Sequence, residues 1–380
     1  MILVRGLHST NVEPLTTFNP NSVQLTWAKN NTYQFSFTAY ATPRNLIAFE
    51  MLEAESSVFF DKEEYIIKQL SVEAQGGYIS KQVTATHVYN EVNRIRQRKI
   101  INGTKTYTIN DVLGYYFQSN DLGFTWKVHG NFDKQQITDL GNGNAKDGLS
   151  KIIDTWPNTV IFPKQREINV YEINSFQRNL GHRIDYLHDT NDVQLNSDST
   201  TIVNQVRVTG KQKDNSDKDK LIYYFDPFVV TNKDSVEKWG LHPGDDISDE
   251  RFTDKKAMRK YALSQMTSEP SLSITINSRK NSKPTPGEIM RLEVRPMNLV
   301  TKVEVVGYTW YPFDPSQLNS ITLNNNARTI LDYQKRNANS LHKIINAQKT
   351  KYKKIDSAFD LANQAYDSRI YGEVVGESEY

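Results

Sequence analysis

The sequence predicts a mainly β protein of the α+β class: two small antiparallel β-barrels, an inserted α+β region and a long C-terminal helix. Short alternating runs separated by Pro, Gly and Asn fill residues 271–323, and similar runs fill residues 23–85. A heptad repeat occupies residues 331–366. Period 2 predicts strands and period 3.5 predicts a coiled-coil helix, so β domains should be followed by a helix.

Four segments are expected, because the residue pattern changes three times. The first barrel, with one attached helix, covers residues 1–105, and the α+β insert covers 106–200. A second barrel with a helical insertion covers 201–325, and the C-terminal helix covers 326–380. A chain of this length ordinarily divides into several cores. Spacing leaves open whether the last strands complete the second barrel or return to the first.

Composition excludes several classes of site. The chain has no Cys, which excludes disulfides, thiolate metal sites and cysteine nucleophiles. A net charge of +2 gives no general attraction to nucleic acid or to a membrane surface. The apolar run at Met1 stops at Arg5 and is too short for a signal peptide. No stretch is long enough to cross a bilayer, so we expect no membrane-spanning segment.

The first barrel is expected to consist of hairpins. Its β-rich runs, separated by short polar turns, lie at residues 23–27, 32–37, 57–60, 65–69, 78–79 and 81–85. The period then changes. Val88, Val92 and Ile95 are spaced for a helix that runs to about Arg98.

The insert mixes both periods. A helix is expected near Asn110, with Asn110 or Asp111 accepting hydrogen bonds from its first amides. A second helix, at residues 144–156, places Leu149, Ile152, Ile153 and Trp156 on one stripe. Strands are expected at 124–128, 160–162 and 167–171. The polar segment from Asp189 to Thr200 predicts turns and a domain boundary.

The second barrel begins with an alternating run at residues 202–209, a charged loop at 211–220 and a hairpin partner at 221–225. A helix at 254–266 should turn Met258, Tyr261, Ala262 and Met266 inward. The remaining strands are expected at 271–276, 288–294, 301–310 and 320–323. They should be antiparallel, because no crossover helix fits between them.

No group of residues predicts a catalytic, cofactor or metal site. The densest group of candidate ligands, His182 with His188 and Asp189, has no metal-ligand spacing and is better interpreted as a solvated loop. The acidic turn at 245–250 lacks the alternation of a calcium loop. Acid pairs such as Glu63-Glu64 are expected by chance among 44 carboxylates. We therefore expect no cofactor.

The heptad repeat predicts an oligomer interface. Its seam positions alternate in steps of three and four and comprise Leu331, Gln334, Ala338, Leu341, Ile345, Gln348, Tyr352, Ile355, Phe359, Ala362 and Tyr366. The apolar members are expected to pack between helices of a trimer. A long helix packed on its own domain is the alternative, and the two Gln positions keep it open. The basic residues at 343–354 lie mainly off the seam, as a solvated face does.

The order of several short motifs resembles the prophage endopeptidase tail family, the structural N-terminal part of tail-associated lysins in long-tailed phages and prophages. The motifs are Gln24-Leu-Thr-Trp27, Tyr33-Gln-Phe-Ser-Phe37, Glu64-Tyr-Ile-Ile-Lys68, Thr86-His-Val-Tyr89, Asp111-Val-Leu, the run from Gly143 to Leu149, Ile168-Asn-Val-Tyr171, the run from Ile202 to Gly210, the run from Asp249 to Asp254, Pro286-Gly-Glu288 and Tyr311-Pro-Phe-Asp-Pro315. Each is degenerate, and the resemblance lies in their order over residues 1–325.

The resemblance implies a homotrimer in which two barrels per chain make a pseudo-six-fold ring. Such a ring would continue and close the tail tube at the tip of the virion, after synthesis in the cytoplasm of a bacterial host. It would bind the hexameric distal tail protein, the tape-measure protein, and receptor-binding or lytic tail elements. The family is also similar to baseplate hubs of contractile tails and to type VI spikes.

Two further classes of function are kept. Many members of the family carry a C-terminal lytic domain, and this sequence ends at Tyr380 without one. A cell-wall-degrading endopeptidase or lysin that acts through dispersed carboxylates is the alternative to a structural hub. A β-rich receptor-binding module is the third.

Overall fold

The computed structural model describes residues 1–213, 222–297 and 299–324, which belong to one compact unit, Met1–Asn325. The described residues are mostly strands with several helices, which confirms the α+β, mainly β class. The predicted heptad seam lies outside them. Among the described residues, no helix is long and apolar enough to span a membrane.

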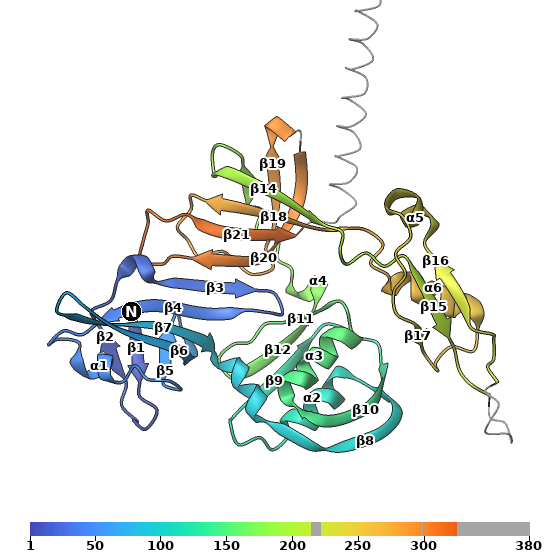
Figure 1. The fold of residues 1–380 in the computed structure, drawn as a ribbon, viewed down its shortest axis with the longest axis horizontal. Helices are drawn as coiled ribbons and strands as arrows, with labels where there is room; N and C mark the ends of the chain where they lie inside the picture. The colour runs from blue at the N-terminus through green and yellow to red at the C-terminus, as the bar shows by residue number, and fades with distance from the viewer. Residues whose placement is uncertain (214–221, 298, 325–380) are drawn as a thin grey trace, which may run out of the picture. The chain divides into compact units, whose positions relative to one another are not determined.

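The largest sheet of the described residues has 13 strands (Figure 1). Eleven of them follow one another in the order β14 (Thr190–Asp198), β18 (Ser271–Ser278), β21 (Asn319–Asn324), β20 (Leu299–Trp310), β3 (Gln24–Ala28), β4 (Tyr33–Tyr40), β7 (Tyr78–His87), β6 (Glu63–Gln75), β5 (Ser57–Phe60), β1 (Ile2–Arg5) and β2 (Glu13–Leu15). β19 (Ile289–Val294) also pairs with β20, and β13 (Arg183–Asp185) pairs with β19. The four expected strands of residues 271–323 are confirmed, and they are antiparallel.

The strands near the C-terminal end of the described residues join the N-terminal ones. β20 pairs with β21 and β19, which is the pairing expected if the last strands complete the second barrel. It also pairs with β3, from Gly307 opposite Ala28 to Trp310 opposite Leu25. The two arrangements left open by spacing therefore occur together, because one 12-residue strand is long enough to serve both partners.

Two expectations about secondary structure in residues 88–200 were wrong. The expected helix at 88–98 is a 3-10 helix, Val88–Arg94, followed by the strand β8 (Arg96–Tyr107). Val88 and Val92 are buried, so their spacing reflects burial within this short 3-10 helix. The polar segment 189–200 contains β14, which pairs along its length with β18. β14 is polar because one face is open, so its polarity was mistaken for turns.

The middle of the chain has its own core, with small sheets and two helices packed together (Figure 1). The elements are β8, α2 (Ile109–Phe117), β9 (Thr125–His129), β10 (Gln135–Asn144), α3 (Ala145–Thr155), β11 (Thr159–Ile161), β12 (Glu167–Glu172) and α4 (Ile173–Phe176). Both longer helices begin with reciprocal capping boxes, Thr108 with Asp111 and Asn144 with Asp147. The expected helices and strands of this region are confirmed, but the N-cap of α2 is Thr108: its hydroxyl accepts from the Asp111 amide, whereas Asp111 accepts from the Thr108 amide and not from the first helical turn.

A smaller core follows in residues 205–265. It contains β15 (Gln205–Thr209), β16 (Phe228–Thr231), α5 (Lys233–Trp239), β17 (Ile247–Ser248) and α6 (Lys255–Gln265). Met258 and Ala262 of α6 are buried in it, as expected. β15 pairs with β16 rather than with residues 221–225, whose described part contributes only a bridge from Tyr223 to Gln212.

Short helices complete the described elements: η1 (Pro20–Ser22), α1 (Leu46–Glu50) and η3 (Arg295–Met297). The domain boundaries at residues 105 and 200 stay predictions. The first falls inside β8, which pairs with β10, and the second follows β14.

Candidate functional site

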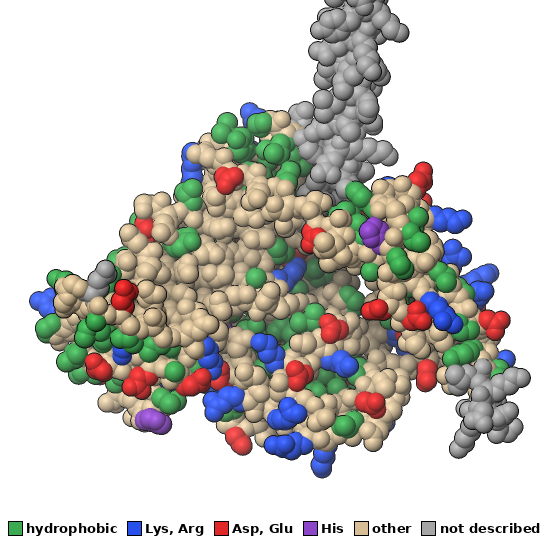
Figure 2. Space-filling model, viewed as in Figure 1, with side chains coloured by type: hydrophobic (Ala, Val, Ile, Leu, Met, Phe, Trp, Pro, Cys, Tyr) green, Lys and Arg blue, Asp and Glu red, His purple; other side chains and the backbone are tan. Residues whose placement is uncertain are grey.

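One face of the large sheet is polar and almost uncharged. Its side chains come from eight consecutive strands and are Gln194, Asn196, Ser273, Thr275, Asn277, Ser320, Thr322, Asn324, Thr309, Gln24, Thr26, Gln34, Ser36, Thr38, Gln82, Thr84, Thr86, Gln69 and Ser71. We call this surface the polar face. Charged side chains lie at its margins, at Glu73, Asp192, Asp198 and Glu304, and beyond Glu304 the same face carries Lys302 and Arg291. Figure 2 shows few charged side chains over β18, β21, β20, β3 and β4.

The opposite face of the same strands is apolar and buried. Phe35, Phe37 and Tyr65 are among the largest fully buried side chains, and Ile274 and Leu323 occupy the corresponding core of the other half. Because side chains alternate across a strand, burial of this face fixes the register that exposes the Ser, Thr, Asn and Gln side chains. The polar face is therefore specified by the same alternation that forms the core.

The strands of the sheet form two rings with the same order. In ring 1, β1 is followed around the ring by β2, β4, β7, β6 and β5, and β5 pairs with β1. Residues 17–19 connect β2 to β4 through the bridge of Phe18 and Ala39. In ring 2, β13 is followed by β14, β18, β21, β20 and β19, which pairs with β13. If the six strands of each ring are numbered in chain order, their order around both rings is first, second, third, sixth, fifth, fourth.

The rings differ in the orientation of two strand pairs. The first strand of ring 1 is antiparallel to its fourth strand, whereas β13 is parallel to β19. β1 is antiparallel to β2, whereas β13 meets β14 through a parallel bridge of Tyr186 and Thr190. Every other strand pair of the two rings is antiparallel.

The fifth strands of the rings correspond residue by residue. β6 has a bulge between Ile67 and Gln69, and β20 has one between Val305 and Gly307. At each bulge the fourth strand of the ring stops pairing with the fifth. The remaining backbone edge of the fifth strand can therefore pair with another strand. In ring 2 the partner is β3. In ring 1 no described strand pairs with the same edge of β6 beyond residue 67.

The carboxylates of Glu63 and Glu64 hold ring 1 to the middle of the chain. Glu64 accepts from Arg5 at 2.7 Å and from Arg166 at 3.2 Å, and the Ser57 hydroxyl donates to it at 2.9 Å. Glu63 accepts from the backbone amide of Gln165 at 2.6 Å. The pair Glu63-Glu64, which chance alone explains at the level of sequence, thus has a structural place: each carboxylate binds partners within the fold.

His87 is fully buried beside this pair. Its ring stacks on Tyr33 with centroids 4.5 Å apart, and its Nδ1 accepts from the Tyr89 amide at 3.2 Å. Nε2 must then carry the proton that it donates to Glu63, 3.0 Å away. Burial lowers the pKa of His87, and the hydrogen bond to Glu63 opposes that shift only in part.

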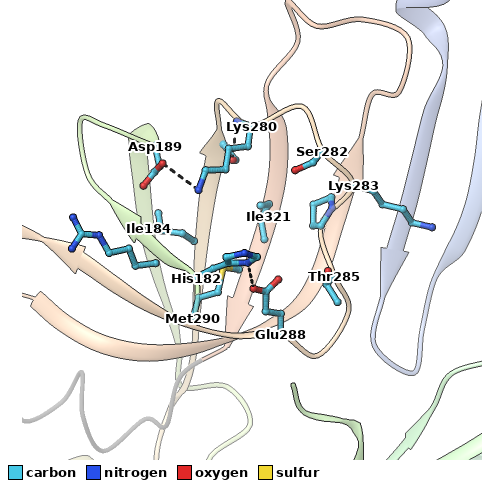
Figure 3. A pocket seen from close by; sticks show the side chains of 13 residues that line it. His182, Ile184, Asp189, Lys280, Ser282, Lys283, Thr285, Glu288, Met290 and Ile321 are labelled. Carbon is cyan, nitrogen blue, oxygen red and sulfur yellow. Dashed lines mark hydrogen bonds and ion pairs between the residues drawn. The ribbon is translucent and has the colours of Figure 1, made fainter. Parts of the chain in front are cut away.

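The histidine-rich segment of the sequence lines a pocket of about 320 Å³ in ring 2 (Figure 3). His182 Nδ1 lies 2.5 Å from the buried carboxylate of Glu288, and Lys280 lies 3.4 Å from Asp189. Burial opposes ionisation of Asp189, but the Asp185 amide, His188 and Lys280 outweigh it and lower its pKa. Ile184, Met290 and Ile321 complete the wall.

These groups do not form a metal centre. Among the described residues, no three His, Cys, Asp or Glu side chains are placed to hold a metal ion. His188 lies on Asp189, at 3.1 Å, rather than beside His182 and Glu288. In the acidic turn 245–250, Asp249 is engaged by Arg251 at 2.6 Å.

Sequence analysis missed both strand edges that the polar face presents. It ended the β6 strand at Gln69, although Leu70, Val72 and Ala74 continue the alternation. In β14, Val193 and Leu195 alternate with polar residues, which is the signal that could have identified a strand there.

Comparison with solved structures identifies tail proteins of prophages. The chain is similar to a prophage tail protein from Listeria monocytogenes EGD-e, with 25% identity and a TM-score of 0.64 over 90% of this chain and 99% of that one. It has the fold of the 43 kDa tail protein of prophage MuSo2 from Shewanella oneidensis, with 9% identity, a TM-score of 0.58, and 85% and 97% coverage. A tail protein from Neisseria meningitidis gives 10% identity, a TM-score of 0.55, and 86% and 96% coverage. The fold thus defines a structural protein of phage tails.

The chain belongs to the prophage endopeptidase tail family, as the order of its motifs predicted. The model of the prophage endopeptidase tail N-terminal domain matches residues 2–87, that of the prophage endopeptidase tail domain matches residues 93–170, and that of the prophage endopeptidase tail matches residues 178–334. A comparison with curated proteins gives no match.

Proposed function

We propose that this chain is the hub of a phage or prophage tail tip, a homotrimeric ring that continues and closes the tail tube. The observation that carries the proposal is the equivalence of ring 1 and ring 2. Each chain has two equivalent rings, so three chains together present six similar units. They can therefore meet a six-fold tube without six copies of the chain.

The polar face supports a role as the wall of a channel. Nucleic acid binds proteins chiefly through Lys and Arg contacts to phosphate, and these residues are absent from the polar face as defined above. A wall of Ser, Thr, Asn and Gln is hydrated yet offers no fixed charge to hold a passing polymer. In the proposed ring, the polar faces of all six units line the channel, and the rings' cores lie outside it.

The proposed partners follow from the family and from this geometry. One end of the six-unit ring binds the hexameric distal tail protein, and the tape-measure protein ends at the channel. Receptor-binding or lytic tail elements attach on the distal side. The heptad seam of residues 331–366 adds a trimeric coiled coil to the same assembly. The location is the tail tip of the virion, after synthesis in the host cytoplasm.

The mass of the purified chain in solution tests the proposal. Light scattering is expected to give three times the chain mass of 43.7 kDa. A monomer at every concentration, with no assembly on addition of the distal tail protein, would contradict the hub.

The alternative function, a cell-wall endopeptidase or lysin, has a separate test. Glu63 and Glu64 are engaged by His87, Gln165, Arg5 and Arg166, which suits a structural role. Zymography on peptidoglycan is expected to show no clearing by the chain. Clearing that disappears in the Glu63→Gln/Glu64→Gln variant would favour the enzyme.

A further inference from the structure

We propose that residues 69–72 of β6 pair, edge to edge and antiparallel, with residues 195–198 of β14 in a second copy of this chain. In the proposed register Gln69 lies opposite Asp198, Ser71 opposite Asn196, and Val72 opposite Leu195. This contact rests on the proposed trimer and specifies its interface, since three such contacts close a ring.

The template for this contact lies within one chain. β20 of ring 2 pairs with β3 beside ring 1, with Gly307 opposite Ala28, Thr309 opposite Thr26, and Trp310 opposite Leu25. The hydroxyls of Thr26 and Thr309 lie 3.3 Å apart across the junction. The junction thus joins the fifth strand of one ring to a strand beside the next ring.

β6 is the counterpart of β20. The amide of Ile67 donates to Ser56 and its carbonyl accepts from Glu55, each at 2.9 Å. Val305 makes the same two contacts with Glu288 and Gly287, at 2.9 and 3.0 Å. Counting on from the bulges, Gln69 corresponds to Gly307, Ser71 to Thr309, and Val72 to Trp310.

β14 is the counterpart of β3. Leu25 lies opposite Phe35 of β4, which lies opposite Ala85 of β7. Leu195 lies opposite Ile274 of β18, which lies opposite Leu323 of β21. β4 and β18 are the third strands of their rings and β7 and β21 the sixth, so Leu195 corresponds to Leu25. By the same count, Asn196 corresponds to Thr26 and Asp198 to Ala28.

Both edges can accept a partner. Among the described residues, no strand pairs with the outer edge of β14 at 193–198 or with that of β6 at 68–75. Neither segment contains Pro, so every backbone amide is a donor. Unpaired edges of this length are sites of strand addition.

The side chains fit the register. Val72 is 59% exposed in the isolated chain, and Leu195 would cover it as Leu25 covers Trp310. Ser71 and Asn196 would meet on the polar face, where Thr309 and Thr26 meet in the template. No like charges face each other between Gln69 and Val72. By analogy with the β20–β3 junction, we therefore expect a second copy of the chain to pair with this edge.

Engineered disulfides test the register, because the natural sequence has no Cys. Residues directly opposite in an antiparallel pair have Cα atoms about 4.5–5.5 Å apart, within the range of a disulfide. Under mild oxidation, Ser71→Cys/Asn196→Cys in the full chain is expected to give covalent dimers and trimers on a denaturing gel. Thr26→Cys/Thr309→Cys is the matched control and should close a bond within one chain.

Two further variants make the result specific. Ser71→Cys/Gln194→Cys, displaced by two residues on the same face, is expected to cross-link at most one tenth as much. Val72→Lys should raise the concentration at half-dissociation of the trimer roughly tenfold or more, because it buries a charge at the contact. Val300→Lys is its control, since Val300 is 51% exposed on β20 and away from the proposed edge.

The outcomes separate this contact from the hub itself. A trimer by light scattering that gives no cross-link, or cross-links best through Gln194, overturns the register while the hub stands. A chain that stays monomeric overturns both. Intermolecular cross-links in the 71–196 pair, together with dissociation by Val72→Lys and not by Val300→Lys, support the proposed contact.

Discussion

Glu55 and Gly287 occupy the same place in the two rings, and both have a left-handed backbone, with φ of 68° and 72°. Each donates its amide to the carbonyl of the residue that precedes a bulge, Ile67 in β6 and Val305 in β20. A repeated left-handed turn, a repeated bulge and a repeated strand order are independent features. Their coincidence indicates that the rings are two copies of one structural unit.

The turn at Gly287 is expected to resist substitution. Gly287→Ala pays about 1–2 kcal/mol for a left-handed L residue, and its Cβ would lie 2.6 Å from the Phe176 ring. Gly123→Ala is the control, because Gly123 has the same φ of 72° with nothing within 4 Å. Chemical denaturation should show the larger loss of unfolding free energy at Gly287. Equal losses would contradict a packing role for this turn.

Glu64 is expected to stabilise the joint between ring 1 and the middle of the chain. Glu64→Gln removes the charge that Arg5 and Arg166 share, and the cost should be about 1–3 kcal/mol for a hydrogen-bonded buried group. The exposed Glu53→Gln provides the control and should change stability little. Thermal unfolding measures both, and equal melting temperatures for the two variants would refute the structural role.

His87 should make stability fall with acid. Because burial lowers its pKa in the folded chain below the usual 6.5, the unfolded chain binds a proton first as the pH falls. The contribution of His87 is therefore complete above pH 6.5 and is lost progressively below it. In His87→Gln this part of the pH dependence should be missing. Denaturation at pH 7.5 and 5.5 compares the two proteins, and identical losses on acidification would argue against the assignment.

Much of the fold could be predicted from the sequence where one face of a strand is buried. Residues 271–323 alternate clearly because Ile274, Ile276, Ile321 and Leu323 fill the core of ring 2. β14 could not be recognised in the same way. Its two apolar side chains, Val193 and Leu195, are only half-buried and its remaining side chains are polar, so in this isolated chain the strand resembles a loop. The α-helix expected at 88–98 was wrong for a different reason, since burial of Val88 and Val92 in a short 3-10 helix imitates α-helical spacing.

Only the family resemblance allowed the candidate site to be predicted from the sequence. The resemblance implied two repeated domains, but no alternation identifies the partner of an open strand edge. That information lies in the pairing of β20 with β3, which joins residues nearly the whole described chain apart. The contacts of Glu63 and Glu64 to Gln165 and Arg166 depend on a fold that spacing does not reveal.

The heptad seam stays a sequence prediction, because its residues lie outside those the structure describes. Ile345→Lys/Ile355→Lys places six charges in a trimeric seam, an unfavourable burial of several kcal/mol in sum. The double variant should lose helical circular dichroism or sediment more slowly, while the described domains keep their melting transition. Unchanged sedimentation and helicity would show that the helix does not associate through this seam.

The equivalence of the two rings is tested most directly by electron microscopy of the purified full-length assembly, viewed along its axis. We predict a ring of six similar lobes around a central channel, with a particle mass of three chains. Lobes should alternate between two types, since the middle domain follows ring 1 and the smaller core of residues 205–265 is inserted into ring 2. A ring with three lobes, or six lobes from six chains, would contradict the account.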